Sequence, residues 1–171
     1  MRENLTIGFI GNPNCGKTTL FNAYTGANLK VANWPGVTVE KVEGAIKDHD
    51  LNIRLVDLPG TYSLTSYTME EQVSRQFILS DEVDVIIDVA DASALERNLY
   101  LTLQLLELGK PVVLALNMMD IVESAAWRLT HTDCRKCWAS RSFQFQPENG
   151  QDWMCYFMQP RTIKTVKIRS V

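Results

Sequence analysis

The stretch GNPNCGKT at residues 11–18 contains the residue types that could hold a polyphosphate. It follows an apolar, β-rich run at residues 5–10 and leads into a segment with helical spacing at residues 17–26. Its two glycines are separated by four residues and are followed by lysine and threonine. In a strand, loop and helix arrangement of this kind, successive backbone N–H groups and the helix N-terminus surround phosphate groups. The pattern therefore predicts a P-loop.

The residues of this loop have different expected roles. The ammonium group of Lys17 would reach the β- and γ-phosphates, and the hydroxyl of Thr18 would ligate magnesium. Cys15 is interpreted as a small residue that fits the loop, and the alternative is a reactive thiolate near a helix start. The predicted phosphate-binding residues are Gly11, Asn12, Pro13, Asn14, Cys15, Gly16, Lys17, Thr18 and Thr19.

The segment NMMD at residues 117–120 predicts a site for the nucleotide base. The amide of Asn117 would meet the O6/N7 edge of guanine, and the Asp120 carboxylate would accept hydrogen bonds from N1–H and the N2 amino group. Adenine lacks those donors and would leave the carboxylate unpaired, so adenine is disfavoured. The thioether of Met118 can cover the face of the base. The alternative is an ordinary turn after a strand.

Two further segments predict contacts that depend on a third phosphate. Asp57 in DLPG ends the run NIRLVD and would hold magnesium through water, while the N–H of Gly60 could meet the γ-phosphate. Thr38 in NWPGVTVE would complete the metal shell only when that phosphate is present, which makes the segment a switch. Trp34 beside it is either a mobile aromatic of this switch or a packed core residue. The predicted magnesium ligands are Thr18, Thr38 and Asp57.

These segments lie in a chain whose strands and helices alternate up to about residue 120. Residues 42–57 predict a hairpin, and the apolar runs at residues 83–91 and 111–117 predict parallel strands covered on both faces. An amphipathic helix is expected between those runs at residues 95–109. The alternation predicts an α/β fold of the P-loop NTPase class, a Ras-like G domain with a mostly parallel, doubly wound sheet and the ligand at the carboxyl ends of its strands.

Length and charge limit the possible functions. The 171 residues suffice for one α/β domain, and a net charge of -3 argues against a protein that binds nucleic acid through bulk positive charge. No apolar run reaches the ~18 residues that cross a bilayer, and the N-terminus does not read as a signal peptide. We therefore expect a soluble, cytosolic chain, in which the four cysteines form no disulfide.

Five strings resemble one family: GNPNCGKTTLFN, NWPGVTVEK, VDLPGTYSL, LERNLYLTLQLLELG and ALNMMD are similar to the GTP-binding domain of the prokaryotic ferrous iron transport protein B, FeoB. The resemblance covers roughly residues 4–123. It implies a GTP-binding and GTP-hydrolysing cytoplasmic domain at the amino end of a polytopic membrane protein that imports ferrous iron. The implied partners are guanine nucleotide and a transmembrane iron permease at the cytosolic face of the cell membrane, with nucleotide state gating uptake.

The resemblance also bears on mechanism. Thr61 stands where Ras-like enzymes carry a water-orienting glutamine, so slow intrinsic hydrolysis is expected. In potassium-activated relatives, an asparagine three residues before the P-loop lysine helps to bind a monovalent cation, and the resemblance gives this role to Asn14. The alternative for Asn14 is a turn residue that tolerates unusual φ and ψ. Potassium thus joins magnesium and GTP or GDP as an implied cofactor, and the residues assigned to catalysis are Asn14, Lys17, Thr38 and Gly60.

Residues 124–171 do not resemble the end of the family domain, which would supply a last parallel strand, a serine-alanine pair near guanine O6 and a final helix. No helical or strand period is visible here. The favoured interpretation is a reading-frame slip: codons can be chosen for residues 137–153 such that a reading one base earlier gives VLGVPVVPISAGKRTGL. The alternative is a natural tail. The predicted domains are a G domain at residues 1–123 and an atypical segment at residues 124–171.

Loss of the last strand and helix would remove a contact to guanine and leave a sheet edge open. Open edges favour pairing with a second copy, so a homodimer through this edge or through exchanged elements is predicted. A zinc site of Cys134, Cys137, His131 and Cys155 is disfavoured, because a lone CxxC with this spacing matches no standard pattern.

Two other functions fit the same motifs. One is a stand-alone GTPase that acts on the ribosome or RNA, although this chain offers only the short basic end KTVKIRS. The other is a non-catalytic guanine-nucleotide sensor, because Thr61 is no base.

Overall fold

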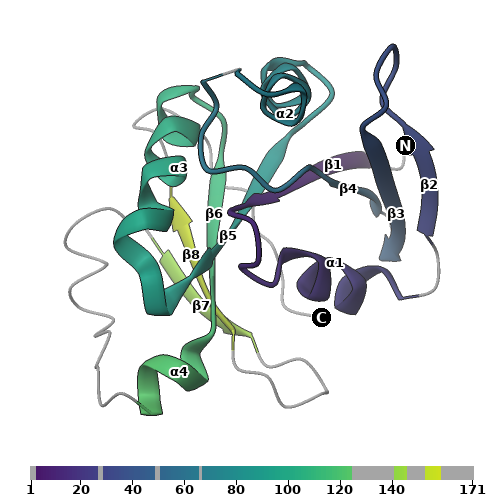
Figure 1. Ribbon diagram of the computed structural model, residues 1–171. Coiled ribbons are helices and arrows are strands. Elements are labelled where there is room, and N and C mark those ends of the chain that lie inside the picture. The colour runs from purple at the N-terminus through teal and green to yellow at the C-terminus, as the bar shows by residue number, and fades with distance from the viewer. Residues whose placement is uncertain are drawn as a thin grey trace.

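The chain forms one eight-stranded sheet with helices on both faces, in a computed structural model that describes residues 3–26, 29–48, 51–65, 67–124, 141–145 and 153–158 (Figure 1). The strands are β1 (Glu3–Gly11), β2 (Leu29–Asn33), β3 (Glu40–Asp48), β4 (Leu51–Asp57), β5 (Val85–Asp91), β6 (Val112–Asn117), β7 (Arg141–Phe145) and β8 (Trp153–Met158). The helices are α1 (Lys17–Thr25), α2 (Met69–Leu79), α3 (Leu95–Glu107) and α4 (Met119–Ser124), with a 3-10 turn η1 (Ala92–Ala94).

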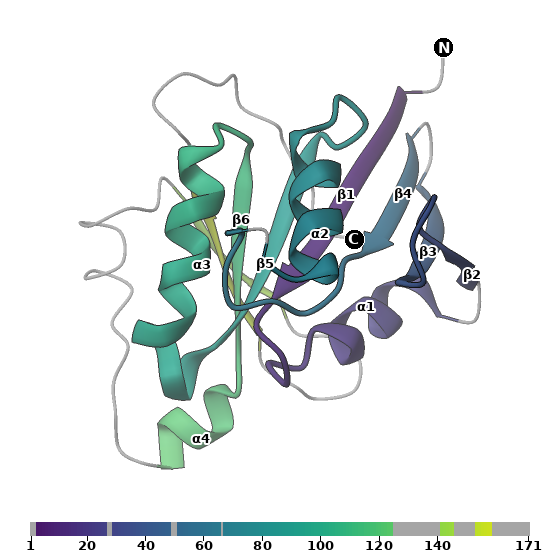
Figure 2. The same ribbon diagram turned by 45° about the horizontal axis from the view of Figure 1, so that its top comes forward.

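Four parallel strands at the centre of the sheet position the site. The strand order is β2-β3-β4-β1-β5-β6-β8-β7, and the neighbours β4, β1, β5 and β6 run parallel (Figure 2). From β1 the chain first builds β2, β3 and β4 on one side, then crosses to β5 and β6 on the other. The carboxyl ends of all four strands therefore lie along one edge, and the chain leaves β1 at the switch point where ligands bind in such sheets.

The helices bury two separate apolar clusters against the sheet. Leu20 and Phe21 of α1 pack with Phe9 on one face. On the other face the cluster includes Phe77 of α2 and Leu101 of α3. Local signals explain where the helices start and stop: α2 begins with a capping box between Thr68 and Glu71, and the N–H of Gly26 closes α1 on the Asn22 carbonyl. The expected doubly wound α/β class is confirmed.

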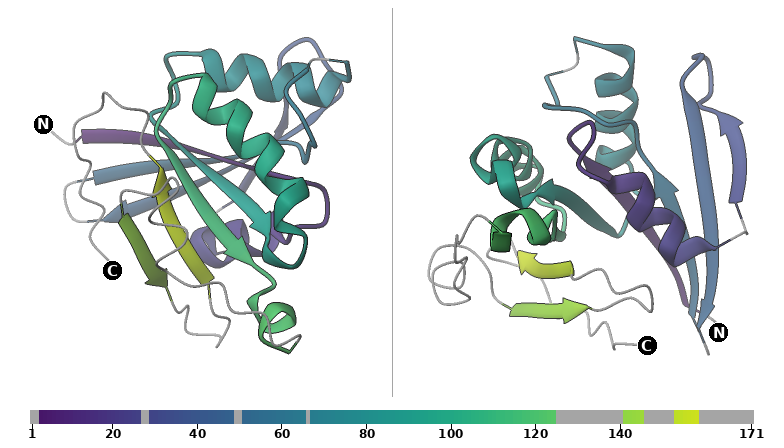
Figure 3. Two further views of the ribbon diagram at one scale, coloured as in Figure 1. Left: turned by 90° about the vertical axis from the view of Figure 1, so that its left-hand side faces the viewer. Right: turned by 60° about the horizontal axis from the view of Figure 1, so that its bottom comes forward.

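The side of the sheet beyond β6 differs from the expectation. In place of a last parallel strand, β8 runs antiparallel to β6, with Leu114 opposite Tyr156, and β7 lies beyond it (Figure 3, left). The expectation that this edge lies open is therefore wrong, because backbone hydrogen bonds to β8 cover it. No strand period is visible in the sequence of this tail, but the run WMCYFM of β8 is continuously apolar and aromatic, which also suits a pleated sheet.

No helix in the described part of the chain is both long and apolar enough to cross a bilayer. Within the same residues, no three His, Cys, Asp or Glu side chains gather as metal ligands would.

Candidate functional site

The loop between β1 and α1 has the backbone of a phosphate cradle. Asn14 has φ 64° and Gly16 has φ 83°, so two residues of the loop adopt the left-handed conformation that turns successive N–H groups toward one side. A Cβ at Gly11 would collide with the Val89 carbonyl, and one at Gly16 would collide with the Asn117 amide. Both positions therefore require glycine, and the loop ends at the N-terminus of α1.

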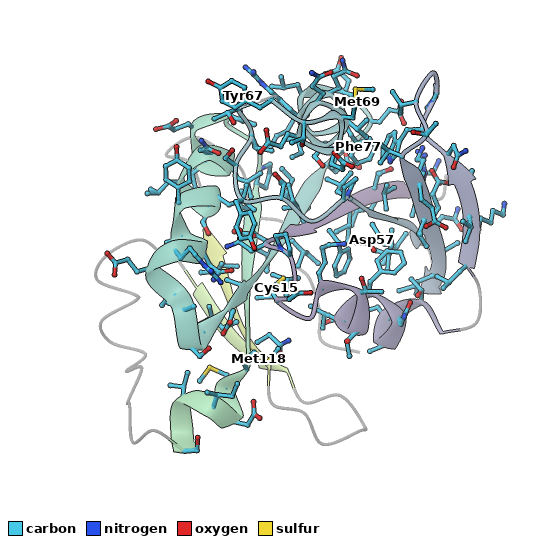
Figure 4. All side chains as sticks on the ribbon, in the orientation of Figure 1. Cys15, Asp57, Tyr67, Met69, Phe77 and Met118 are labelled. Carbon is cyan, nitrogen blue, oxygen red and sulfur yellow. The ribbon has the colours of Figure 1, made fainter. Side chains whose placement is uncertain are left out.

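Lys17 joins this loop to the end of β4. Its ammonium group forms a largely buried ion pair with the carboxylate of Asp57. Figure 4 labels Asp57 near the centre of the sheet edge. Burial raises the pKa of Asp57, and the Lys17 charge, which lowers it, offsets only part of that effect. Little water reaches the two side chains, so each charge is neutralised mainly by the other. If the ion pair opened, both Lys17 and Asp57 could contact a ligand.

The DLPG segment lies directly against the P-loop. The N–H of Leu58 donates to the Phe9 carbonyl at 2.9 Å, and the N–H of Thr61 donates to the Gly11 carbonyl at 3.0 Å. Gly60 is exposed, and a Cβ built on it would come within 3.3 Å of the Cα of Pro13. The backbone of this segment therefore faces the mouth of the P-loop.

Thr61 is buried, and its hydroxyl donates to the Ser63 carbonyl at 2.7 Å. In this position it holds the backbone of its own loop and does not face the mouth of the site. This geometry agrees with the view that Thr61 cannot act as the glutamine of Ras-like enzymes does.

The segment that is predicted to read the base, residues 117–120, follows β6 and is hydrogen-bonded to the P-loop. The side-chain amide nitrogen of Asn117 donates to the Cys15 carbonyl at 2.9 Å, which leaves a second N–H and the amide oxygen for a ligand. Met118 has φ 61°, a left-handed turn that reverses the chain between β6 and α4. Asp120 lies exposed in the first turn of α4, and Met119 anchors that turn in the core.

Cys15 faces the interior and not the solvent. It is buried in the cluster beneath α1, and burial raises the pKa of its thiol to about 11. A thiol with so high a pKa is almost wholly protonated at neutral pH and a poor nucleophile. The structure therefore favours the small-residue interpretation of Cys15 over the reactive one.

Most of the remaining predicted residues lie at the surface, and Asn12 does not. Asn14, Thr18, Thr19 and Thr38 are all exposed, with Asn14 at the mouth of the P-loop and the two threonines in the first turn of α1. Thr38 lies in the loop between β2 and β3, and the structure gives it no hydrogen bond to Asp57 or Lys17 among the described residues. Asn12 is buried, and in the described part of the chain neither polar atom of its side chain has a hydrogen-bond partner.

Sequence reasoning missed Glu71, which organises the loop after DLPG. Its carboxylate accepts hydrogen bonds from the Ser63 hydroxyl at 3.2 Å and from the N–H of Tyr67 at 2.9 Å. It also completes the capping box with Thr68 at the start of α2. A Thr-x-x-Glu pattern before a helix is a recognised sign of such a box, so the sequence TMEE carried the signal.

The donor set fits a nucleotide and a hard divalent cation. A left-handed backbone loop, an ammonium group and a helix N-terminus suit a polyphosphate. The hydroxyl of Thr18 and the carboxylate of Asp57 are oxygen ligands of the kind that magnesium prefers. The exposed amide of Asn14 offers an oxygen suited to a monovalent cation. Cys134, Cys137 and His131, of the zinc site that the sequence disfavours, fall outside the described residues, and of Cys155 only the backbone in β8 is described.

Comparison with known proteins gives the same family throughout. Residues 5–140 match the profile of the family described as Ferrous iron transport protein B. The chain is 58% identical over 131 residues to the Fe(2+) transporter FeoB of Salmonella typhimurium and 57% identical to that of Escherichia coli. Each alignment covers 74% of this chain and 17% of the relative, so the chain spans about a sixth of the length of these relatives.

Solved structures that resemble this chain belong to the same family. The G domain of the T. maritima FeoB iron transporter superposes with a TM-score of 0.72 at 41% identity, covering 78% of this chain and 82% of that one. The cytosolic domain of L. pneumophila FeoB gives 0.71 at 52% identity, covering 77% and 58%. A GDP-bound NFeoB mutant of S. thermophilus gives 0.71 at 49% identity, covering 77% and 52%. With its P-loop, DLPG and NMMD segments on one edge of a G-domain sheet, the chain belongs to the ferrous iron transport protein B family, FeoB.

Proposed function

We propose that this domain binds GTP and GDP, hydrolyses GTP slowly, and serves as the nucleotide-dependent part of a ferrous iron transporter. The observation that carries the proposal is the convergence of three segments at one sheet edge. The bond from Asn117 to the Cys15 carbonyl joins the base-reading segment to the P-loop, and the Lys17–Asp57 pair joins the P-loop to the DLPG segment. GDP in the S. thermophilus neighbour supports the same ligand class.

Nucleotide binding would open the Lys17–Asp57 ion pair and give each group a new partner. The ammonium group of Lys17 turns from Asp57 to the phosphate oxygens, which offer it more negative charge. Asp57 is then free to hold magnesium, together with Thr18 and, in the triphosphate state, Thr38. Magnesium, when bound, neutralises charge on the phosphate oxygens. Exchange of one charged partner for another avoids a stage in which a buried charge is left alone.

Base selection would rest on Asn117 and Asp120. The second N–H of the Asn117 amide faces the O6/N7 edge, and the exposed Asp120 carboxylate receives the N1–H and N2 amino donors of guanine. Met118 lies within 4.0 Å of a Cβ built at Gly16, so its thioether sits between the base segment and the P-loop, where a base face would pack.

Hydrolysis would be slow, because the buried Thr61 hydroxyl is committed to the Ser63 carbonyl and no glutamine replaces it. Backbone N–H groups such as that of Gly60 are left to meet the γ-phosphate. The proposal includes potassium at Asn14, where a monovalent cation would offset charge that develops between the β- and γ-phosphates.

We propose coupling to iron import on the basis of the family match. The relatives are Fe(2+) transporters about six times as long as the aligned segment. We take the transmembrane part of such a protein as the partner of this domain at the cytosolic face of the membrane. A ribosome-associated GTPase, which the motifs alone would allow, receives no support from the family match. We also propose weak self-association, at the edge strand β2 and not at the edge of β6 where the sequence analysis placed it, because β8 covers the edge of β6.

Binding is tested by calorimetric titration with GDP, a non-hydrolysable GTP analogue and ATP in the presence of magnesium. We expect both guanine nucleotides to bind, and ATP to bind at least about a hundredfold more weakly. Equal uptake of ATP and GDP, or uptake of neither, contradicts the proposal.

Turnover is tested by phosphate release from GTP in matched potassium and sodium chloride. We expect a faster rate in potassium and loss of that difference in Asn14→Ala, with GDP affinity retained. Equal rates in the two salts would remove potassium from the proposal, and binding without any turnover would favour the non-catalytic sensor.

Iron coupling is tested by ferrous iron uptake in cells whose own FeoB carries residues 5–123 of this chain in place of the matching segment. Uptake should be retained with this segment and lost when it carries Lys17→Ala. If iron uptake is equal with the unchanged segment and with the Lys17→Ala segment, transport does not depend on the nucleotide site.

A further inference from the structure

Trp34 lies in the loop between β2 and β3 that carries Thr38, yet its side chain is buried in the cluster beneath α2 and α3. Its ring meets the ring of Phe77 edge to face, with centroids 5.3 Å apart and an interplanar angle of 64°. The ammonium group of Lys41 lies 4.4 Å from the centre of the Trp34 ring. The indole is thus held between a core aromatic of α2 and a cation of β3.

Backbone hydrogen bonds close residues 34–39 into a compact loop around this anchor. The N–H of Trp34 donates to the Val39 carbonyl at 2.9 Å, and the N–H of Val37 donates to the Trp34 carbonyl at 3.2 Å. Val37 and Val39 pack against the same core cluster. Thr38, between them, is exposed. The loop therefore has three apolar side chains turned inward and presents the Thr38 hydroxyl outward.

The anchor is not fully satisfied. The indole N–H of Trp34 is buried, and among the described residues it has no hydrogen-bond partner. A buried donor without an acceptor weakens the packing that holds it. The position of the Trp34 ring therefore depends on its contacts with Phe77 and Lys41, because among the described residues the indole N–H adds no hydrogen bond.

Phe77 connects the anchor to the rest of the site. It projects from α2 toward the sheet (Figure 4), and a Cβ built on Gly8 of β1 would lie 3.4 Å from its ring. The strand β1 leads into the P-loop three residues later, and α2 follows the DLPG segment. One aromatic contact thus joins the loop that carries Thr38 to the helix that follows the γ-phosphate segment.

We infer that Trp34 is a positioning residue for Thr38: its contact with Phe77 fixes the loop of residues 34–39 on α2, so that Thr38 is presented to the third phosphate and its metal. The inference rests on the proposed GTP binding and adds a residue to it. Since Thr38 acts only in the triphosphate state, Trp34 contributes to the affinity for GTP and to its turnover, and not to the affinity for GDP.

The experiment compares Trp34→Ala and Trp34→Phe with the control Tyr100→Ala, which removes an exposed aromatic ring from α3. Affinities for GDP and for a non-hydrolysable GTP analogue are measured with magnesium, together with the maximal rate of GTP hydrolysis. For Trp34→Ala we expect about a tenfold loss of analogue affinity and a lower maximal rate, with GDP affinity within about twofold of the wild type. Trp34→Phe, which keeps an aromatic edge, should lie between, and the control should change neither affinity.

Phe77→Leu should reproduce the selective loss, and combining it with Trp34→Ala should add little, because both changes remove the same contact. Should Trp34→Ala fail to fold, the fluorescence of Trp34 in a chain with its other tryptophans replaced by phenylalanine gives a second measurement. Its emission should change with the GTP analogue and not with GDP.

Equal losses of GDP and analogue affinity would show that Trp34 only supports the fold, and the inference would be wrong. Unchanged affinities, or Trp34 emission that responds to both nucleotides alike, would also overturn it. If the wild type binds GDP and GTP while these results fail, the proposed function stands and only the role of Trp34 is lost. A wild type that binds neither overturns both.

Discussion

Asp120 is the residue on which the choice of purine depends in the proposed site. Asp120→Asn should weaken GDP binding by about 2–3 kcal/mol, roughly 30- to 150-fold, because the new amide cannot accept both guanine donors. The same amide can donate to the C2 oxygen of xanthine, so xanthosine diphosphate should become the better ligand. Competitive titration of both nucleotides against the wild type and the variant measures the change, with Ser124→Ala at the other end of α4 as the control. Retained guanine preference in Asp120→Asn would place the base elsewhere.

Asp88 titrates inside the core. It is fully buried in β5 and accepts a hydrogen bond from the Thr102 hydroxyl at 2.6 Å, and burial raises its pKa from 3.8 to about 7. Between these values the unfolded chain ionises while the folded chain keeps its proton. The stability that Asp88 contributes is therefore present below pH 4 and lost as the pH rises through 7.

Asp88→Asn should prevent the loss of stability at high pH, because the amide stays neutral and its oxygen can still accept a hydrogen bond from the Thr102 hydroxyl. We expect the free energy of unfolding at pH 8 to rise by up to roughly 4 kcal/mol relative to the wild type, with little difference at pH 4. Denaturant unfolding at the two pH values measures it, and the exposed Asp81→Asn is the matched control. A variant that is no more stable than the wild type at pH 8 would show that Asp88 is ionised at little cost.

At the scale of elements, the loop from DLPG into α2 depends on one carboxylate. Glu71 caps α2 and holds the Ser63 hydroxyl and the Tyr67 N–H, so Glu71→Ala should cost about 1 kcal/mol and lower the melting temperature by about 2–4 °C. The neighbouring Glu70, exposed in the same first turn, provides the control Glu70→Ala. Limited proteolysis should cut residues 61–68 faster in Glu71→Ala only. Equal melting and cleavage in both variants would mean that the loop holds itself without this side chain.

Elements whose signals are local could be predicted from the sequence. The P-loop, the hairpin of β3 and β4, the strands β5 and β6, and the helix α3 all carry their own periodicity, glycine stops or apolar runs. The strand β2 could not be predicted in this way, because all five of its residues are exposed and show no alternation. The pairing of β8 with β6 escaped prediction because it joins segments about forty residues apart in sequence, which no local period records.

The same limit applies within the site. The types and order of the predicted nucleotide-binding residues can be recognised as motifs in the sequence, whereas the contacts between these residues cannot. Lys17 and Asp57 are forty positions apart, and Asn117 lies 102 positions from Cys15. Whether Trp34 is a free switch aromatic or a core residue is decided by its packing on Phe77, and nothing near Trp34 in the sequence encodes that contact. Motifs therefore predict which residue types the site contains, and the fold determines which of their side chains contact one another.

At the scale of the whole molecule, the edges of the sheet determine how copies could associate. The edge of β6 is taken by β8, and among the described strands the sheet ends at β2 and β7. β2 presents exposed side chains along its whole length, with Val31 63% exposed. A strand edge that carries an exposed apolar residue is a template for a second strand. Self-association is therefore expected at β2, next to the loop that carries Thr38.

Sedimentation velocity over a range from micromolar to sub-millimolar protein tests this expectation. The wild type should form a growing fraction of dimer, and Val31→Lys should stay monomeric, because a charge on an edge strand opposes pairing. Leu79→Lys, which places the same charge on an exposed apolar position at the end of α2, should still dimerise. If Val31→Lys still forms dimers, the interface lies on another surface. If the wild type stays monomeric throughout the range, the predicted dimer is wrong. Because β2 leads directly into residues 34–39, dimerisation at this edge would also restrain Thr38, and the dimer fraction should then differ between the GDP-bound and GTP-analogue-bound protein.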